Sequence, residues 1–224
     1  MEQLLQLIGK NIDVEISGKS FYQGVLIDAG LDIIVIYQEQ EFIYIPLVHV
    51  QHIEQSSLPE DLPEQPPDVP IHFQTDNISY RKVLDNAKGK FIEIYVTGNK
   101  SIHGYVTSIM NDYFVFYSPV YNTIFVSLDH VKWIIPSPPH LTPYSLANQH
   151  FPVNPTSIPL SRTFEQQCKR LEGNLVVFDL GDHPNKIGLL VKMESSMLKL
   201  VTANGKSRLL NLRHLKTFHL PGVS

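Results

Sequence analysis

Residues 9–53 read GKNIDVEISGKSFYQGVLIDAGLDIIVIYQEQEFIYIPLVHVQHI. Apolar and polar residues alternate over residues 12–16, which is typical of a strand with one buried face. A nearly continuous apolar run follows at residues 33–37, and a Leu-x-His segment at residues 47–49 comes before a short final apolar stretch. Glycines and polar residues separate these runs. The pattern predicts five short antiparallel strands.

The same pattern returns twice further along the chain. Residues 89–134 read GKFIEIYVTGNKSIHGYVTSIMNDYFVFYSPVYNTIFVSLDHVKWI, and residues 173–218 read GNLVVFDLGDHPNKIGLLVKMESSMLKLVTANGKSRLLNLRHLKTF. In each stretch two glycines lie 15 residues apart, and a histidine follows the second glycine after 25 or 26 residues. The recurring positions are Gly9, Gly24, Leu47 and His49; Gly89, Gly104, Leu128 and His130; and Gly173, Gly188, Leu212 and His214. Fixed spacing at so many positions predicts three copies of one supersecondary unit.

The glycines, and the residues before each stretch, predict small curled sheets. The second glycine of each stretch stands at the start of the second expected strand, where it permits a sharp bend or a close approach of backbones. A short helix with one apolar face is expected before each stretch. Its apolar residues are Leu4, Leu5 and Ile8; Tyr80, Val83 and Leu84; and Phe164, Cys168 and Leu171. Because Cys168 belongs to such a face, we interpret it as a core residue rather than a nucleophile.

Twelve of the 16 prolines lie between the three stretches, five in residues 59–70 and seven in residues 136–159. Proline lacks an amide hydrogen and restricts the residue before it, so these segments are predicted to be linkers. They are either disordered spacers or arms that dock on neighbouring surfaces. Docking is favoured for the second linker, whose apolar residues are Leu141, Tyr144, Leu146, Phe151, Val153 and Ile158. The predicted organisation is barrel 1 at 1–54, an acidic linker at 55–78, barrel 2 at 79–136, an uncharged linker at 137–161 and barrel 3 at 162–220.

The composition of the 224 residues is typical of a folded protein without a disulfide framework. The chain is 43% hydrophobic and 18% charged, and it has one cysteine. No apolar run approaches the ~20 residues of a membrane span. The N-terminal residues MEQLLQLIGK lack the basic start and long apolar run of a signal peptide. We therefore expect cytoplasmic synthesis and no membrane span.

No catalytic pattern stands out. Paired carboxylates with a pocket, a Ser-His-Asp set and a glycine-rich phosphate loop are all missing from the sequence, so we expect no enzyme, no cofactor and no metal. Asp28 and Asp32 are interpreted as turn residues. The repeated His49, His130 and His214 either fix the turn before the fifth strand through backbone hydrogen bonds, or meet in a shared metal or pH-sensing cluster. The first interpretation is favoured, because one histidine per unit supplies few ligands at any one place.

Charge separates along the chain, although the net charge is only −4. Residues 1–54 carry two basic and eight acidic side chains, whereas residues 162–224 carry ten basic and five acidic ones. Such opposition can steer head-to-tail association between chains, or pack the third unit against the first. The alternative is a face that binds nucleic acid, formed by Lys199, Lys206, Arg208, Arg213 and Lys216. This alternative is less favoured because aromatic residues for base stacking are almost missing from the third stretch.

A short helix followed by five bent strands resembles the Sm-like small barrel. The run from LLQLIGKNIDVEISG through GVLIDAGLDIIVIY to YIPLVHVQHI more closely resembles an uncharacterised repeat family of Bacillus-type spore-formers, some of whose members are described as spore coat or sporulation-related. The resemblance implies an all-β fold with short helices, made of three tandem Sm-like five-stranded small barrels joined by Pro-rich linkers. It also implies a non-catalytic scaffold, located in the spore coat or another sporulation assembly, which binds protein partners or itself.

The sequence departs from the Sm proteins that bind RNA at the positions where those proteins contact nucleotides. Such proteins carry an Asp-x-x-Met-Asn-like stretch near the third strand and Arg-Gly or Lys-Gly before the last strand. The first position here reads DIIV at 32–35, DYFV at 112–115 and SMLK at 196–199, and the second reads Pro46-Leu47, Ser127-Leu128 and Asn211-Leu212. The resemblance therefore extends to the fold and not to the RNA site. RNA binding by the basic third barrel stays as the alternative function.

Overall fold

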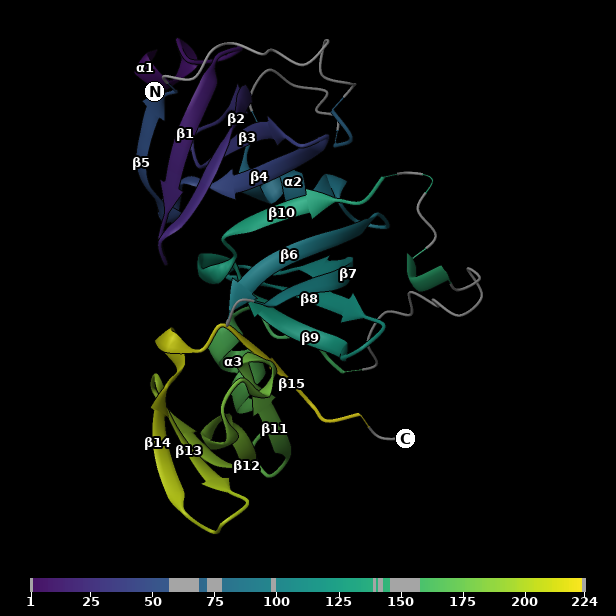
Figure 1. The fold of residues 1–224 in the computed structure, drawn as a ribbon. Coiled ribbons are helices and arrows are strands. Elements are labelled where there is room, and N and C mark those ends of the chain that lie inside the picture. The colour runs from purple at the N-terminus through teal and green to yellow at the C-terminus, as the bar shows by residue number, and fades with distance from the viewer. Residues whose placement is uncertain are drawn as a thin grey trace.

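The computed structural model describes residues 2–56, 69–71, 78–97, 100–138, 140, 143–145 and 158–222. We call residues 2–56 the first segment, 78–138 the second segment and 158–222 the third segment. Figure 1 shows the three segments following one another along the molecule, with the second segment in the middle. The chain is mostly β, with a few short helices.

Each segment starts with a short helix and continues into five strands. The first segment contains α1 (Glu2–Leu5), β1 (Asn11–Ile16), β2 (Ser20–Ala29), β3 (Ile33–Gln38), β4 (Glu41–Pro46), the 3₁₀ turn η1 (Leu47–His49) and β5 (Val50–Gln55). The second contains α2 (Tyr80–Asn86), β6 (Phe91–Thr97), β7 (Lys100–Ile109), β8 (Tyr113–Ser118), β9 (Asn122–Ser127), η2 (Leu128–His130) and β10 (Trp133–Pro136). The 3₁₀ turn η3 (Pro143–Ser145) lies between the second and third segments. The third contains α3 (Phe164–Lys169), β11 (Leu175–Phe178), η5 (Asp179–Gly181), η6 (Pro184–Lys186), β12 (Ile187–Glu194), β13 (Met197–Thr202), β14 (Ser207–Asn211), η7 (Leu212–His214) and β15 (Thr217–His219). The expected Leu-x-His turn is thus a 3₁₀ turn each time, and the leucine begins it.

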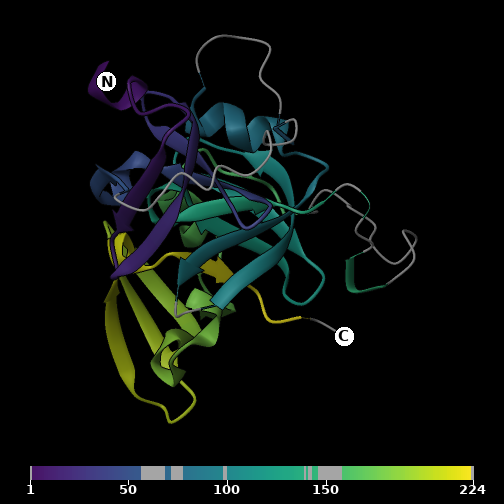
Figure 2. The same cartoon turned by 45° about the horizontal axis from the view of Figure 1, so that its top comes forward.

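The strands form a single antiparallel sheet, in the order β14-β13-β12-β11-β15-β9-β8-β7-β6-β10-β4-β3-β2-β1-β5. Within each segment the first strand pairs with the second and the fifth, the second with the third, and the third with the fourth. The sheet does not close, and β14 and β5 lie at its two ends. Figure 2 shows how it bends from one segment into the next. The predicted all-β fold with short helices is confirmed at this level, and the sheet is open and continuous through the three segments. The three Sm-like barrels stay a prediction.

Two joints between segments make the sheet continuous. In the first joint, β10 pairs with β4 and places Ile134 opposite Tyr44. In the second joint, β15 pairs with β9 and places Phe218 opposite Phe125. The physical reason is that a fourth strand with an unpaired edge leaves its N–H and C=O groups without partners, which the fifth strand of the next segment supplies. Barrels that sit apart along a tether are therefore excluded for the described segments.

The joints also merge the cores. The second core includes five residues from the first segment: Ile33, Val35, Tyr37, Phe42 and Tyr44. The third core includes three residues from the second segment: Tyr113, Val115 and Phe125. The first core takes Trp133 and Ile135 from the second segment. The third and fourth strands of the first two segments are therefore buried on both faces, one face in their own core and the other in the core of the next segment.

The repeated glycines fall into two kinds. A Cβ on Gly24, Gly104 or Gly188 would lie 2.4, 2.0 or 2.3 Å from a backbone oxygen of the facing third strand. These three positions therefore require glycine for the close approach of two backbones, as predicted. The other three, Gly9, Gly89 and Gly173, end the helical turn with positive φ angles of 81°, 75° and 84°.

Parts of the predicted linkers lie against the segments. Ile71 and Ile78 are buried in the second core. The ring of Tyr144 meets that of Phe91 edge-on, with centroids 6.2 Å apart, and Ile158 packs on the third core. These contacts agree with docked arms at the described positions. Four apolar residues of the second linker, Leu141, Leu146, Phe151 and Val153, lie outside the described residues.

Candidate interaction site

The first joint is fastened by contacts beyond strand pairing. Asp32, in the turn between β2 and β3, accepts a hydrogen bond from the backbone N–H of Tyr80 at 2.8 Å. Lys132 donates from Nζ to the backbone oxygen of Ser17 across the same joint. Because α2 begins at Tyr80, the carboxylate of Asp32 caps a helix of the following segment, where a negative charge is favoured.

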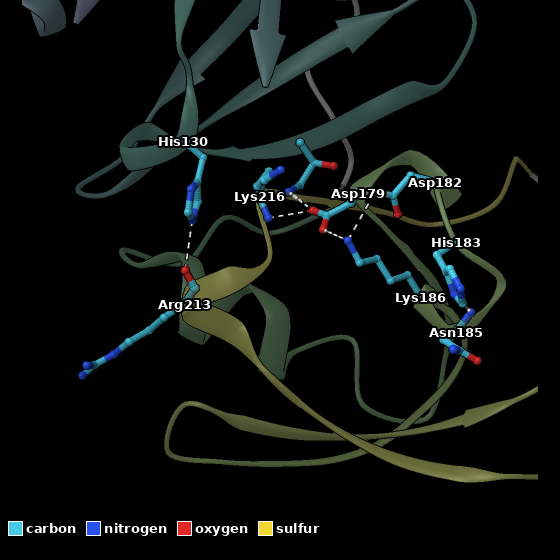
Figure 3. Close-up of polar contacts among 9 residues, drawn as sticks. His130, Asp179, Asp182, His183, Asn185, Lys186, Arg213 and Lys216 are labelled. Carbon is cyan, nitrogen blue, oxygen red and sulfur yellow. Dashed lines mark hydrogen bonds and ion pairs between the residues drawn. The ribbon is translucent and has the colours of Figure 1, made fainter. Parts of the chain in front are cut away.

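The second joint repeats this arrangement. Asp112 accepts a hydrogen bond from the backbone N–H of Phe164, the first residue of α3, at 2.7 Å. The backbone N–H of Ser127 donates to the carbonyl of Lys216 at 2.9 Å. His130 Nε2 lies 3.0 Å from the carbonyl oxygen of Arg213, so the ring donates across the joint in the tautomer with hydrogen on Nε2. Figure 3 shows this contact between the second segment and the turn before β15.

A buried carboxylate holds the start of β15 (Figure 3). Asp179 is fully buried, and its Oδ1 accepts hydrogen bonds from the backbone N–H groups of Lys216 at 2.7 Å and Thr217 at 3.1 Å. Lys186 Nζ lies 2.6 Å from Asp179 Oδ2 and 3.3 Å from Asp182 Oδ2. Burial alone would lower the pKa of Lys186, but the two carboxylates outweigh it and raise that pKa. This cluster fixes the strand that carries the second joint.

The repeated histidines end the three 3₁₀ turns and serve different contacts. His49 Nδ1 lies 3.2 Å from Ser17 Oγ. Burial, followed by the charges of Lys132 and His130, lowers the pKa of His49, and the backbone of Asp129 works in the opposite direction. His214 is exposed and has no ring hydrogen bond among the described residues. In the same part of the chain, no three His, Cys, Asp or Glu side chains are grouped to hold a metal ion. His49 thus contacts a side chain, and His130 contacts a backbone carbonyl of the next segment, so the turn-fixing interpretation stays a prediction.

The five basic residues of the alternative nucleic-acid face are only partly brought together. Lys199, Lys206 and Arg213 are exposed at β13, before β14 and in η7. Arg208 lies on β14, and its Nε is buried without a hydrogen-bond partner in the described segments. Lys216 lies at the second joint instead, where its backbone binds Asp179 and Ser127. Four of the five therefore lie on β14 or next to it, on β13 and in the turns at its two ends.

Cys168 behaves as the sequence predicts. It is fully buried in the third core, and burial raises the pKa of its thiol to about 12. A thiol of such high pKa is a poor nucleophile, because the thiolate is the reactive form. Of the helices in the described ranges, none has the length and apolar character needed to cross a bilayer.

Comparison with known proteins gives a relative of nearly equal length. "Uncharacterized protein YwrJ" from Bacillus subtilis (strain 168) is 43% identical over 225 residues, which cover 99% of this chain and 100% of that protein. The chain belongs to the YwrJ family. The domain described as the YwrJ third domain matches residues 163–218, so β14 and the Asp179 cluster both fall within that match. A YwrJ relative in Bacillus agrees with the part of the resemblance that pointed to Bacillus.

The roles of three features of the site were not predicted from the sequence. Asp179 carries no local pattern that separates it from an ordinary turn residue. Asp32 was interpreted as a turn residue, and the Asp at the same place in the second copy, Asp112, was the available signal for a shared role. The edge strands β5 and β14 could be named as strands, but their position at the ends of the sheet follows from the pairing between segments.

Proposed function

We propose that this protein is a non-catalytic structural protein that associates with protein partners, or with itself, through sheet edges and exposed strand faces. The observation that carries this proposal is the construction of the two joints, where a fourth strand pairs with a fifth strand and its outer face enters the next core. Interfaces of this kind are those of stable assemblies, which resemble a domain core cut in half.

We also propose that each segment is an open Sm-like small barrel. The support is the common strand order, the preceding helix, the glycine at the close approach of the second and third strands, and the 3₁₀ turn before the fifth strand. A unit of about 50 residues buries a small share of its surface and is marginally stable alone. Sharing edges and cores with a neighbour compensates for this, so association is part of how such a unit stays folded.

The proposed location is the spore coat or another sporulation assembly. It is supported by the resemblance of the first copy to repeat proteins of Bacillus-type spore-formers and by the Bacillus subtilis relative. A fluorescent fusion, expressed from a sporulation-dependent promoter in Bacillus subtilis, tests it. A ring of fluorescence around the forespore is expected, and even fluorescence throughout the mother cell would count against this location.

Association is tested by light scattering after gel filtration, at several concentrations and with solubilised coat proteins added. We expect a mass above the 25.5 kDa of one chain, in the protein alone or in the mixture. A strict monomer under both conditions would contradict the proposed function.

Nucleic-acid binding is the second candidate, because four basic residues lie on β14 or next to it. It predicts a mobility shift with RNA that weakens as salt is raised. Reversing the charge at Lys206 and Arg208 would then abolish the shift. An RNA shift that survives both substitutions, or none at low salt, would remove this candidate.

A further inference from the structure

We propose that a second copy of this chain pairs its β5 with β14 of the first copy, in a third joint of the kind already present twice within the chain. Among the described residues, β14 pairs with β13 alone and β5 with β1 alone. β14 is the fourth strand of its segment and β5 is the fifth strand of its own, and both internal joints combine a fourth with a fifth strand. The inference rests on the proposed function and names its partner and surface.

The residue at the centre of each internal joint has a counterpart on β14. Tyr44 pairs with Val35 and Phe125 with Val115 on the preceding strand, and Leu209 pairs in the same way with Lys199. Tyr44 and Phe125 are 0% exposed, whereas Leu209 is 69% exposed. Of these three residues, Leu209 is therefore the one that no fifth strand covers in the described part of the single chain.

The other side of the joint shows the same difference. Ile53 pairs with Val14 on β1, as Ile134 pairs with Ile94 and Phe218 with Phe178. Ile134 and Phe218 are fully buried by a strand of the preceding segment, while Ile53 is only half-buried. A strand laid along β5 would bury it.

Transfer of the internal register fixes which residues meet. In the second joint Phe125 faces Phe218 and Val126 faces Thr217. The same register places Leu209 opposite Ile53 of the second copy. One step further along each strand, Arg208 then faces Glu54.

Arg208 and Glu54 are suited to such a pair. Arg208 Nε is buried and has no hydrogen-bond partner in the described part of the chain. The side chain of Glu54 is 63% exposed, and its one close charged neighbour among the described ion pairs is His52, at 3.3 Å. Opposite charges that face each other across two antiparallel strands stabilise the pairing, and like charges in the same place destabilise it.

The charges around the two edges and the composition of the exposed face also fit a second copy. Residues 1–55, which contain β5, carry an excess of six acidic side chains, and residues 162–224, which contain β14, carry an excess of five basic ones. The internal joints bury Val35 and Val115 where the third segment has the exposed Lys199. A face with a lysine in this place tolerates water, so the third joint forms and dissociates while the internal joints stay closed.

The turn next to β14 carries His214, which stands where His130 stands in the second segment and makes no ring hydrogen bond among the described residues. His130 contacts the carbonyl of Arg213 across the second joint. In the third joint the same geometry brings His214 to the carbonyl of Val48, whose side chain is 71% exposed in the single chain. Both residues are exposed in the single chain.

Charge reversal on the full-length protein tests the register. The mass of the wild type and of the variants Arg208→Glu and Glu54→Arg is measured by light scattering over a wide range of concentrations. The wild type is expected to exceed 25.5 kDa as concentration rises. Each single variant is expected to associate about tenfold or more weakly, because like charges then face each other in every joint.

Two restorations make the test specific. The double variant Arg208→Glu/Glu54→Arg pairs opposite charges again, and an equimolar mixture of the two single variants does so in both possible joints. Both samples are expected to recover the mass of the wild type. Lys169→Glu, on α3, alters the net charge as Arg208→Glu does and is expected to leave association unchanged.

The possible failures separate this inference from the proposed function. The register is wrong, and the proposed function stands, if the wild type associates and the single variants associate equally well. The same holds if the double variant and the mixture fail to associate although the circular dichroism of the variants is that of the wild type. A wild type that stays at 25.5 kDa alone but binds coat proteins overturns the second copy as the occupant of this edge. If it binds nothing, both proposals fail.

Discussion

Replacement of Asp179 by asparagine should weaken the third segment at the second joint far more than replacement of the neighbouring Asp182. Asp179 has a positive φ of 48°, a conformation that asparagine tolerates, so this change removes the charge with little effect on the backbone. The carboxylate is fully buried, binds the N–H groups of Lys216 and Thr217, and lies 2.6 Å from Lys186 Nζ. All three contacts are weakened at once.

The size of the effect follows from these contacts. A backbone donor loses about 1 kcal/mol when its acceptor changes from charged to neutral, and two donors are affected. Loss of the partly buried ion pair with Lys186 adds about 1 kcal/mol or more, which gives a total of about 3 kcal/mol. Asp182 is 29% exposed and lies 3.3 Å from the same ammonium, so Asp182→Asn should cost below about 1 kcal/mol.

Urea unfolding followed by circular dichroism gives the two free energies of unfolding, and hydrogen exchange locates the effect. Peptides that contain β15 should lose protection in Asp179→Asn and keep it in Asp182→Asn. If the two variants agree to within about 0.5 kcal/mol, the limit of ordinary surface substitutions, the buried carboxylate does not hold the joint as described here.

Three further predictions concern single positions. Gly104→Ala would place its Cβ 2.0 Å from the backbone oxygen of Tyr117, so the free energy of unfolding, measured by thermal unfolding, should fall by about 1–3 kcal/mol or more. Gly222→Ala, where the added Cβ meets only an ordinary contact, should leave it unchanged. Burial raises the pKa of the Cys168 thiol from 9.0 to about 12, so the thiol loses its proton at lower pH in the unfolded chain than in the folded protein. The free energy of unfolding should therefore fall between pH 9 and 12, and Cys168→Ala should reduce this fall. Burial lowers the pKa of His219 below its ordinary 6.5, so the unfolded chain takes up a proton more readily than the folded protein, and the free energy of unfolding should fall as pH drops below 6.5. His219→Phe, which keeps a ring beside Tyr121, should reduce this loss. If the dependence of the free energy of unfolding on pH is unchanged in the variant, His219 does not cause it.

Much of the local structure could be predicted from the sequence, because it depends on neighbouring residues. Alternation over residues 12–16 marked β1, and the Leu-x-His pattern marked the turn before each fifth strand. Gly104 and its two counterparts were placed correctly at a close approach of backbones. These features are set by side-chain period and by backbone sterics, which act over a few residues.

The joining of the segments was harder to predict, because every strand edge offers the same N–H and C=O groups. One signal was nevertheless present in the third strands. Residues 33–37 and 113–117 are almost wholly apolar, as strands buried on both faces are. In the third segment Lys199 interrupts the run, which indicates one exposed face. Asp179 left no such signal, since its donors come from residues 37 and 38 positions away along the chain.

The shared cores also give the chain a direction in which it is built. The first core takes two buried residues, Trp133 and Ile135, and the partly buried Tyr95 from later in the chain, whereas the second and third cores include the outer faces of the segments before them. The ribosome synthesises the N-terminal segment first, so each later segment can fold against the outer face of a segment that is already folded. Removal of the last segment leaves the outer faces of the earlier segments in place, while removal of the first segment deletes Val35 and Tyr44 from the second core. Folding is therefore expected to proceed vectorially, from the end that carries β5 to the end that carries β14.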